Sequence, residues 1–475
     1  MVVILDTTLR EGELHPGVYY TAEARKTIGL ALAEVGTPRI EFPIVHPSRG
    51  GLIQDIKSVI EAVRESYGNV ELIVQCRALR EDIENAANYN ADGCGVFLAA
   101  TQEHRMAKFG GLSRDEATRR FVEAIELLKS YGFKYRRAVI EDASRFFTAE
   151  TKEEDTLQFL FSLVKSVYAA GATVVSIPDT SGISIHRSIS DIIQTTKKET
   201  NAPLAGHFHN DYGNSLPNAI EAVLAGVDEI HVSIYGLGSR NGITDHYELV
   251  ANLEDLYGVR VGERRSGFMN LYQTFHRMTG IPIPWRHPLS SLARTEKAGT
   301  HQAQVVLSPV GYVPRKKFEH DFRGQASFEA GQLMSKRVVD EILKNYDVGE
   351  EVRDEIVVAV AERSALKARK LSPMEVGDII EAKSGISIPR ETIARTIRGL
   401  EYAYLLIKLR PQYPVRRIMD EVSGWDEVER VDEVYGDVDM VLLTQLRDLE
   451  GKDVVDKIRK KFSEGIIDIA ALILE

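Results

Sequence analysis

Cysteine and tryptophan are scarce in this chain: each occurs 2 times in 475 residues. So few cysteines exclude a disulfide-stapled extracellular scaffold and fit a reducing compartment. The sequence also opens on a strand-like segment, without a basic-then-apolar leader, so we expect a cytoplasmic protein. Cys76 and Cys94 both lie in apolar, strand-like segments, where buried free thiols are the more common outcome than a redox pair.

Positive charge is in deficit as well. Lysine and arginine together number 59 and aspartate and glutamate 70, so the formal net charge is −11. Non-specific nucleic-acid binding needs a basic surface, which this composition does not supply. No apolar run approaches the roughly 20 residues of a membrane span. We therefore expect neither a nucleic-acid partner nor a membrane.

The glycine-rich dinucleotide fingerprint is missing after the first predicted strand, which argues against a doubly wound open sheet. What residues 1–258 do show is a regular alternation of short apolar runs with amphipathic stretches. This order predicts an α/β fold in which parallel strands and helices close into a (β/α)₈ TIM barrel. The eight predicted strands are 2–6, 38–43, 71–76, 93–98, 135–141, 173–177, 204–209 and 228–233.

Three further regions follow the predicted barrel. Residues 259–320 have little regular pattern and are rich in proline, so we expect a linker subdomain that is functional or wraps a partner. Residues 321–400 carry apolar residues at helical spacing and predict a helical subdomain. Residues 401–475 read as βαββαβ, which is a small ferredoxin-like sandwich.

The most informative stretch lies at the end of the first strand. An apolar run reaches Leu5 and is followed at once by Asp6, Arg10 and Glu11. Charged residues delivered by the carboxyl end of a strand are how a parallel barrel builds an active site. Asp6 offers a hard oxygen ligand and Arg10 a cation for a developing oxyanion. The alternative is a surface salt-bridge cluster.

Two later motifs favour an active site. His207 and His209 are two residues apart in a predicted strand, so both imidazoles face one side and form half of a metal site, unless they only cap the strand. Together with Asp6 they would leave coordination positions open for a chelating substrate. The loop 236–242, with its Gly-x-Gly start, follows the last predicted strand, where a βα loop of a barrel is expected.

The stretches 6–13, 207–211 and 236–244 together resemble the metal-dependent Claisen-condensing barrel family. This family contains homocitrate, isopropylmalate and citramalate synthases, with hydroxymethylglutaryl-CoA lyase as a cousin. The ending Asn241-Gly242-Ile243-Thr244 is most similar to homocitrate synthases. The resemblance implies that acetyl-CoA condenses with a 2-oxo acid, 2-oxoglutarate being favoured, on a divalent ion (Mg²⁺, Mn²⁺ or Zn²⁺). Lysine biosynthesis and a homodimer or higher oligomer follow from the same likeness.

The resemblance also implies roles for individual residues. Metal binding falls to Asp6, His207 and His209, and catalysis to Arg10, Glu11, His301 and Tyr312. His301 and Tyr312 would reach into the partner subunit's barrel. The 2-oxo acid would be bound by Arg10, Gln75, Arg137 and Thr180. Thr180 has an alternative role as a helix cap, and the neighbouring Arg136 leaves the register of Arg137 open.

Several positions depart from the family pattern. Leu14 stands where the family usually has Gln, and Ser239 replaces a usual Glu. Ile73, Val96 and Val139 fall where homocitrate synthases carry polar pocket residues, which predicts a more apolar pocket. The acceptor could then be 2-oxoisovalerate, pyruvate or oxaloacetate, and a non-catalytic metabolite sensor is the alternative of another class.

The tail 401–475 resembles the amino-acid-sensing domain of leucine-responsive-type regulators, through its topology and the turn Gly436-Asp437-Val438-Asp439. No helix-turn-helix precedes it, which argues against DNA binding. A committed biosynthetic step is a natural point for end-product control, so we expect an amino-acid effector, with lysine as the first candidate.

Overall fold

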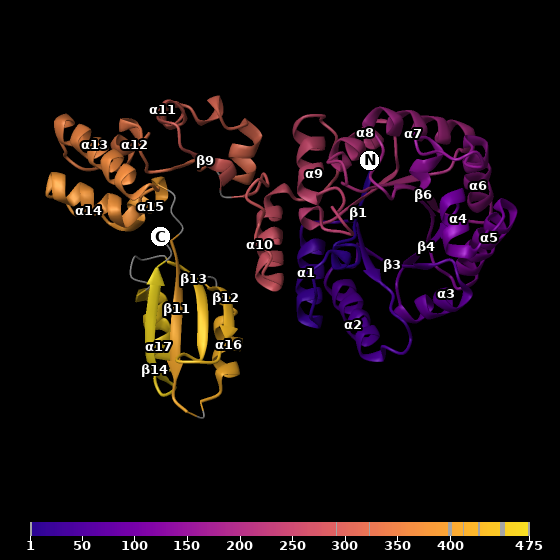
Figure 1. Ribbon diagram of the computed structural model, residues 1–475, viewed down its shortest axis with the longest axis horizontal. Helices are drawn as coiled ribbons and strands as arrows, with labels where there is room; N and C mark the ends of the chain where they lie inside the picture. Colours follow the sequence, from indigo (N-terminus) through magenta and orange to yellow (C-terminus); the bar gives the residue numbers. More distant parts are fainter. Residues whose placement is uncertain are drawn as a thin grey trace. The chain divides into compact units, whose positions relative to one another are not determined.

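The computed structural model describes residues 2–290, 292–322, 324–397, 401–411, 413–425, 428–446 and 452–473. The chain forms two compact units, Met1–Ile283 and Pro284–Glu475, and each is described here by itself. Figure 1 shows the barrel in the first unit and the helical region and small sheet in the second. The predicted domain boundaries after the barrel, which divide the chain into 259–320, 321–400 and 401–475, stay predictions.

The first unit contains a closed barrel of eight strands, in which all neighbouring pairs are parallel and β8 pairs with β1. This confirms the predicted fold. Residues of β4 and β6 are almost all buried, as expected when helices cover the outside and side chains fill the inside. The strands are β1 (Val3–Asp6), β2 (Arg39–Pro43), β3 (Glu71–Arg77), β4 (Gly93–Ala99), β5 (Tyr135–Glu141), β6 (Val174–Asp179), β7 (Leu204–Phe208) and β8 (Glu229–Val232).

Helices surround these strands (Figure 1). Several begin where the side chain of a threonine or serine accepts a hydrogen bond from the amide three residues on, as Thr21, Ser113 and Thr156 do. The helices of this unit are α1 (Ala22–Glu34), α2 (Gly50–Ser66), α3 (Arg80–Ala86), α4 (Gln102–Phe109), α5 (Arg114–Ser130), α6 (Leu157–Ala169), α7 (His186–Thr200), α8 (Ser215–Leu224), α9 (His246–Asp255) and α10 (Phe268–Thr279). Among the described residues, no helix combines the length and the apolar character that a membrane span needs.

In the second unit, a helical region packs around its own apolar core, which includes Val338, Val339, Ile356, Val360 and Ile380. A capping box closes the start of α14, where Ser372 and Glu375 each bind the other's backbone amide. The elements are β9 (Thr295–Glu296), α11 (Gly299–Leu307), β10 (Ser327–Phe328), α12 (Lys336–Ile342), α13 (Glu350–Lys367), α14 (Pro373–Ser384) and α15 (Arg390–Thr396).

The tail forms a four-stranded antiparallel sheet in the order β12-β13-β11-β14. Alternate residues of β11, such as Leu405 and Ile407, share a core with Ile418 and Ile458 of the two helices, so both helices cover one face of the sheet. The βαββαβ order is confirmed. Its elements are β11 (Glu401–Leu409), α16 (Val415–Val422), β12 (Val428–Glu433), β13 (Met440–Leu446), α17 (Lys452–Lys461) and β14 (Ile466–Ile473). Residues 412, 426–427, 447–451 and 474–475 of the predicted tail lie outside the described residues.

Candidate active site

Three buried side chains converge at the carboxyl ends of β1 and β7. The ligand atoms of Glu11, His207 and His209 all lie within 4.8 Å of one another. The two Nε2 atoms of the histidines are 3.3 Å apart. Two nitrogen donors and one carboxylate in this arrangement suit a divalent cation and leave positions open for a chelating ligand. The residues therefore fit the metal that the sequence predicted.

Asp6, the predicted third ligand, does not belong to this group. Its Oδ1 accepts the amide of Thr8 at 2.8 Å, and its Oδ2 lies 2.9 Å from Nδ1 of His246. The other ring nitrogen of His246 lies 2.8 Å from Glu263. Both oxygens of Asp6 thus already have partners, and Glu11, which the family resemblance assigned to catalysis, lies beside the histidines in its place.

The charge state of the histidines follows from their surroundings. Burial, reinforced by His209 and His231, holds the pKa of His207 well below its usual value. Burial also lowers the pKa of His209, although Glu11 opposes the shift. Both rings are therefore neutral near pH 7 and keep the lone pairs that a cation needs. Burial would lower the pKa of His246 too, but Glu263 and Asp6 outweigh it and raise this pKa to about 10.

Arg10 lies between two carboxylates beside the cluster. Its Nε donates to Glu41 at 2.7 Å, and its Nη1 pairs with Glu11. The Arg10 side chain is 14% exposed, whereas that of Glu41 is fully buried. Glu11 also accepts the amide of Ser239 at 3.2 Å. Arg10 is therefore fixed next to the candidate metal ligands, with part of its surface still accessible to a substrate.

Arg137 lies inside the barrel, and its register is now clear. Arg136 points away from the barrel axis and donates to the carbonyl oxygens of Gly171 and Phe133. Arg137 is fully buried: it pairs with Glu41, and its Nη2 donates to Gln75 at 2.5 Å. A Cβ on Gly95 would lie 2.9 Å from Nη2, so the guanidinium packs closely against β4 at this glycine.

These contacts alter what Arg137 and Gln75 can do. Glu41 already balances the charge of Arg137. Burial would raise the pKa of Glu41, but Arg10 and Arg137 hold this pKa well below its usual range. Gln75, expected on the substrate, instead accepts a hydrogen bond from Arg137. The predicted place of Val96 in the pocket is wrong. Gly95 faces Arg137 inside the barrel, and side chains alternate along a strand, so the adjacent Val96 lies on the outer face of β4.

Thr180 lies in the loop after β6. Its Oγ1 accepts the backbone amide of Asp142 at 2.8 Å, and its carbonyl oxygen accepts a hydrogen bond from Arg240. The residue that precedes α7 is Ile185, so Thr180 does not cap that helix. Because its oxygen already accepts one bond, the hydroxyl proton is what Thr180 can offer to a substrate carboxylate.

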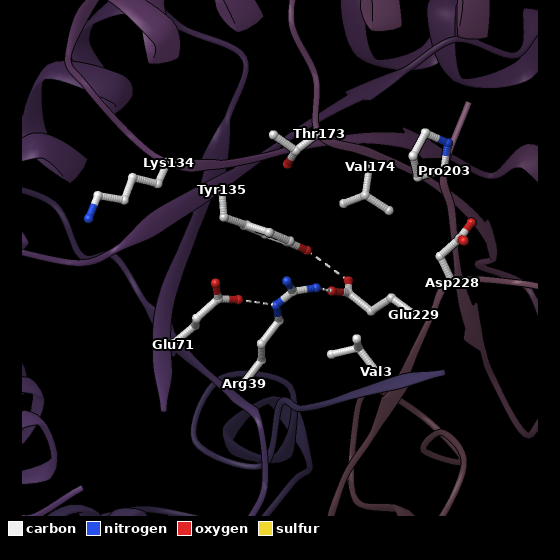
Figure 2. Close-up of a pocket in the computed structure, with 10 residues that line it drawn as sticks. All are labelled: Val3, Arg39, Glu71, Lys134, Tyr135, Thr173, Val174, Pro203, Asp228 and Glu229. Carbon is white, nitrogen blue, oxygen red and sulfur yellow. Dashed lines mark hydrogen bonds and ion pairs between the residues drawn. The ribbon is translucent and has the colours of Figure 1, made fainter. Parts of the chain in front are cut away.

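At the opposite, amino-terminal end of the strands, a cavity of about 290 Å³ opens beside Glu229. Figure 2 shows Arg39 and Tyr135 directed at the Glu229 carboxylate. Burial would raise the pKa of Glu229, but His231, Arg137 and Arg39 outweigh it and lower the pKa to about 2. A buried, charged carboxylate therefore lies at this end of the barrel.

The first 274 residues match the family described as HMGL-like. This chain belongs to the HMGL-like family.

Its curated relatives extend beyond the barrel. A homocitrate synthase from Saccharolobus solfataricus is 28% identical over 466 residues, which cover 96% of each chain. A 2-isopropylmalate synthase from Methanocaldococcus jannaschii is 29% identical over 83% of this chain and 78% of its own. Among solved structures, an HMG-CoA lyase from Acinetobacter baumannii, in complex with coenzyme A and 3-methylmalate, has a TM-score of 0.50 at 20% identity, covering 62% of this chain and 94% of that one. This last likeness shows the shared fold.

Two residues assigned through the family resemblance lie outside the HMGL-like match. His301 and Tyr312 stack on each other in the second unit, with ring centroids 4.2 Å apart and planes 27° apart. His301 Nδ1 also lies 3.6 Å from a carboxylate oxygen of Glu296. The structure thus brings the predicted His and Tyr together, and their part in the chemistry of an HMGL-like barrel stays a prediction.

Sequence reasoning missed four residues of this HMGL-like barrel. Glu41, Glu229, His231 and His246 are all buried, and each contacts a candidate site residue or its direct partner. The signal was present for three of them: Glu41, Glu229 and His231 are polar residues inside short apolar strands. His246 follows a loop and carried no such signal.

Proposed function

We propose that this chain catalyses a Claisen condensation of acetyl-CoA with a 2-oxo acid, on a divalent cation held by Glu11, His207 and His209. The observation that carries the proposal is the buried His–His–Glu cluster with Arg10 beside it, at the carboxyl ends of the barrel strands. The whole-length similarity to homocitrate synthases supports the same reaction class.

When bound, the cation would act as a Lewis acid toward the 2-oxo acid. The reaction then needs a proton removed from the acetyl methyl group, a carbon–carbon bond from that methyl to the keto carbon, and protonation of the new alkoxide. Hydrolysis of the thioester releases coenzyme A. Arg10 is placed to stabilise negative charge on the keto oxygen, and the hydroxyl of Thr180 would donate to the substrate carboxylate. His301 and Tyr312, from a partner subunit, would carry the proton.

For the acceptor we propose 2-oxoglutarate first, which makes the product homocitrate and places the reaction in lysine biosynthesis. The support is the similarity over 96% of both chains to a homocitrate synthase. The tail, with its βαββαβ order, would then bind lysine and inhibit the barrel.

One observation favours a second acceptor class. Arg137 is fully buried and already paired with Glu41, so it is not a free cation for a distal carboxylate. A 2-oxo acid with a neutral side chain, such as 2-oxoisovalerate or pyruvate, would leave this ion pair intact.

The test is the release of coenzyme A from acetyl-CoA across a panel of 2-oxo acids, with and without Mn²⁺. We expect metal-dependent release with one preferred acceptor. Identification of the product by mass spectrometry separates 2-oxoglutarate from the neutral acids. Absence of release with every acceptor and with Mg²⁺, Mn²⁺ and Zn²⁺ would contradict the proposed condensation.

A further inference from the structure

Asp142 directly follows β5 and has an unusual backbone conformation. Its φ of 64° and ψ of 30° lie in the left-handed region, which residues other than glycine seldom adopt and which aspartate tolerates better than most. The residue is fully buried and precedes the short 3₁₀ helix Ala143–Phe146. It lies at the carboxyl ends of the barrel strands, where catalytic residues gather, so its backbone conformation is a candidate for a role in the site.

The side chain of Asp142 holds this conformation in place. Its Oδ2 accepts hydrogen bonds from Oγ1 of Thr101 at 3.1 Å and from Nε of Arg145 at 2.7 Å. Its Oδ1 accepts a hydrogen bond from Oγ of Ser181 at 3.3 Å. The three donors follow β4, β5 and β6 respectively, so one carboxylate ties the segments after three neighbouring strands together.

The backbone amide of Asp142 has a different partner, Thr180. It donates to Oγ1 of Thr180 at 2.8 Å. The carbonyl oxygen of Asp179, the residue before Thr180, accepts the amide of His209 at 3.2 Å, which places Thr180 close to a candidate metal ligand. A hydroxyl that accepts the amide of Asp142 directs its own proton elsewhere. Within the part of the chain that the structure describes, that proton has no acceptor.

We propose that Asp142 positions Thr180 for the 2-oxo acid: its left-handed backbone points the amide at Oγ1 of Thr180, and the hydroxyl proton is thereby presented to the substrate carboxylate. Asp142 is a positioning residue, because it acts through Thr180. The inference rests on the proposed function, in which Thr180 donates to that carboxylate. Hydrogen bonds to charged groups are the stronger ones, so a misdirected hydroxyl proton has a measurable cost.

The first test measures the KM for the 2-oxo acid and the KM for acetyl-CoA in the metal-loaded enzyme, with 2-oxoglutarate and with 2-oxoisovalerate as acceptors. Thr180→Val should raise the KM for the 2-oxo acid by about 10- to 100-fold, since valine keeps the shape without the hydroxyl. Asp142→Ala lacks the carboxylate and disfavours the left-handed region, so it should raise the same KM by about 5-fold. An equal rise in the KM for acetyl-CoA would mean a general distortion and contradict the inference.

Two further single variants separate positioning from packing. Asp142→Asn should recover most of the loss seen in Asp142→Ala, because asparagine also tolerates the left-handed region and its amide oxygen can still accept hydrogen bonds. Ser144→Ala is the matched control: the hydroxyl of Ser144 is buried in the same 3₁₀ helix and has no hydrogen-bond partner among the described residues. Its KM values should stay near those of the wild type. A loss in Ser144→Ala equal to that in Asp142→Ala would overturn the inference.

The double variant Thr180→Val/Asp142→Ala is the decisive comparison. Without the hydroxyl, Asp142 has nothing to orient, so the KM of the double variant for the 2-oxo acid should stay within about 2-fold of that of Thr180→Val. If the two effects multiply instead, Asp142 acts independently of Thr180 and the inference is wrong.

A crystal structure of Asp142→Ala, grown without substrate, tests the geometry apart from any activity. We expect the amide of residue 142 to lie more than about 3.5 Å from Oγ1 of Thr180, and an unchanged contact overturns the inference. If no 2-oxo acid supports release of coenzyme A, the proposed condensation fails, and this crystal structure still decides whether Asp142 sets the position of the hydroxyl. If Asp142→Ala does not fold, Asp142→Gly replaces it with the same expected changes, because glycine has no carboxylate to hold its backbone in one conformation.

Discussion

Glu11 and Asp6 are both buried carboxylates at the carboxyl end of β1, but they have different partners. Glu11 lies with His207 and His209, whereas both oxygens of Asp6 are taken by Thr8 and His246. The residue types alone could not separate the two, since each is a hard oxygen donor near Arg10. Only the loop conformation after β1 decides which carboxylate reaches the histidines.

The different partners of Glu11 and Asp6 predict that Glu11, and not Asp6, binds the metal with His207 and His209. Glu11→Gln should weaken Mn²⁺ binding by more than about 100-fold, because it removes a direct ligand, whereas Asp6→Asn should cost no more than the about 10- to 100-fold of a residue beyond the ligands. His207→Ala should match Glu11→Gln. Titration calorimetry on the three variants is the measurement. If Asp6→Asn abolished binding and Glu11→Gln kept it, the originally expected trio of Asp6, His207 and His209 would be right.

Arg137 gives a second prediction at this scale. Removing one partner of a buried ion pair leaves an uncompensated charge, so Arg137→Met should lower the free energy of unfolding by about 3 kcal/mol. The double variant Arg137→Met/Glu41→Gln should recover part of that loss. Chemical denaturation measures both.

The same variant tests the role of Arg137 in substrate choice. If Arg137 is mainly structural, the specificity constant of Arg137→Met should fall similarly for 2-oxoglutarate and pyruvate. A loss confined to 2-oxoglutarate would instead show that Arg137 binds the distal carboxylate.

At the level of elements, the barrel strands could be placed from the sequence within one or two residues. Predicted strands such as 71–76 and 135–141 correspond to β3 and β5 because short apolar runs bounded by turns are a strong local signal. The direction of each side chain was harder to predict. Parallel strands are buried on both faces, so polarity does not alternate along them, and the sequence could not show that Glu41 faces inward and Val96 outward.

His246, the first residue of α9, predicts an effect of pH on stability. His246 lies between Asp6 and Glu263, and its folded-state pKa is raised from 6.5 to about 10. A raised pKa contributes stability that is fully present below pH 6.5 and is lost as pH rises toward about 10. The free energy of unfolding should therefore fall across this range. His246→Gln removes the titrating charge, and its amide nitrogen can still donate to one of the two carboxylates.

Comparing the wild type with His246→Gln separates the contribution of His246 to stability from that of other titrating groups. Urea denaturation at several pH values between 6.5 and 10 should give a steeper decline for the wild type than for His246→Gln. Parallel curves would mean that His246 does not hold an extra proton in the folded state.

At the scale of the whole molecule, the chain carries more than the condensation needs. The HMGL-like match ends at residue 274, and the βαββαβ tail forms a sheet with a core of its own. No residue assigned to catalysis or metal binding lies in that tail. A separate domain on an enzyme of this class is well suited to sense an end product, and a coupling free energy of about 1–3 kcal/mol suffices for effective inhibition.

We therefore predict that lysine inhibits the full-length enzyme through residues 401–475. If the tail is the sensor, a chain truncated before residue 401 should remain active while its half-maximal inhibitory lysine concentration rises by about 5- to 150-fold, the factor that this coupling represents. The rival explanation is direct competition, in which lysine occupies the 2-oxo acid site. Competition would leave the truncated enzyme as sensitive as the full chain, and added 2-oxo acid would then relieve inhibition in both proteins alike. The measurement is the initial rate of coenzyme A release against lysine concentration, at two acceptor concentrations, for both proteins. It separates the two explanations because only a sensor in the tail makes the inhibition depend on residues 401–475, which the barrel's chemistry does not use.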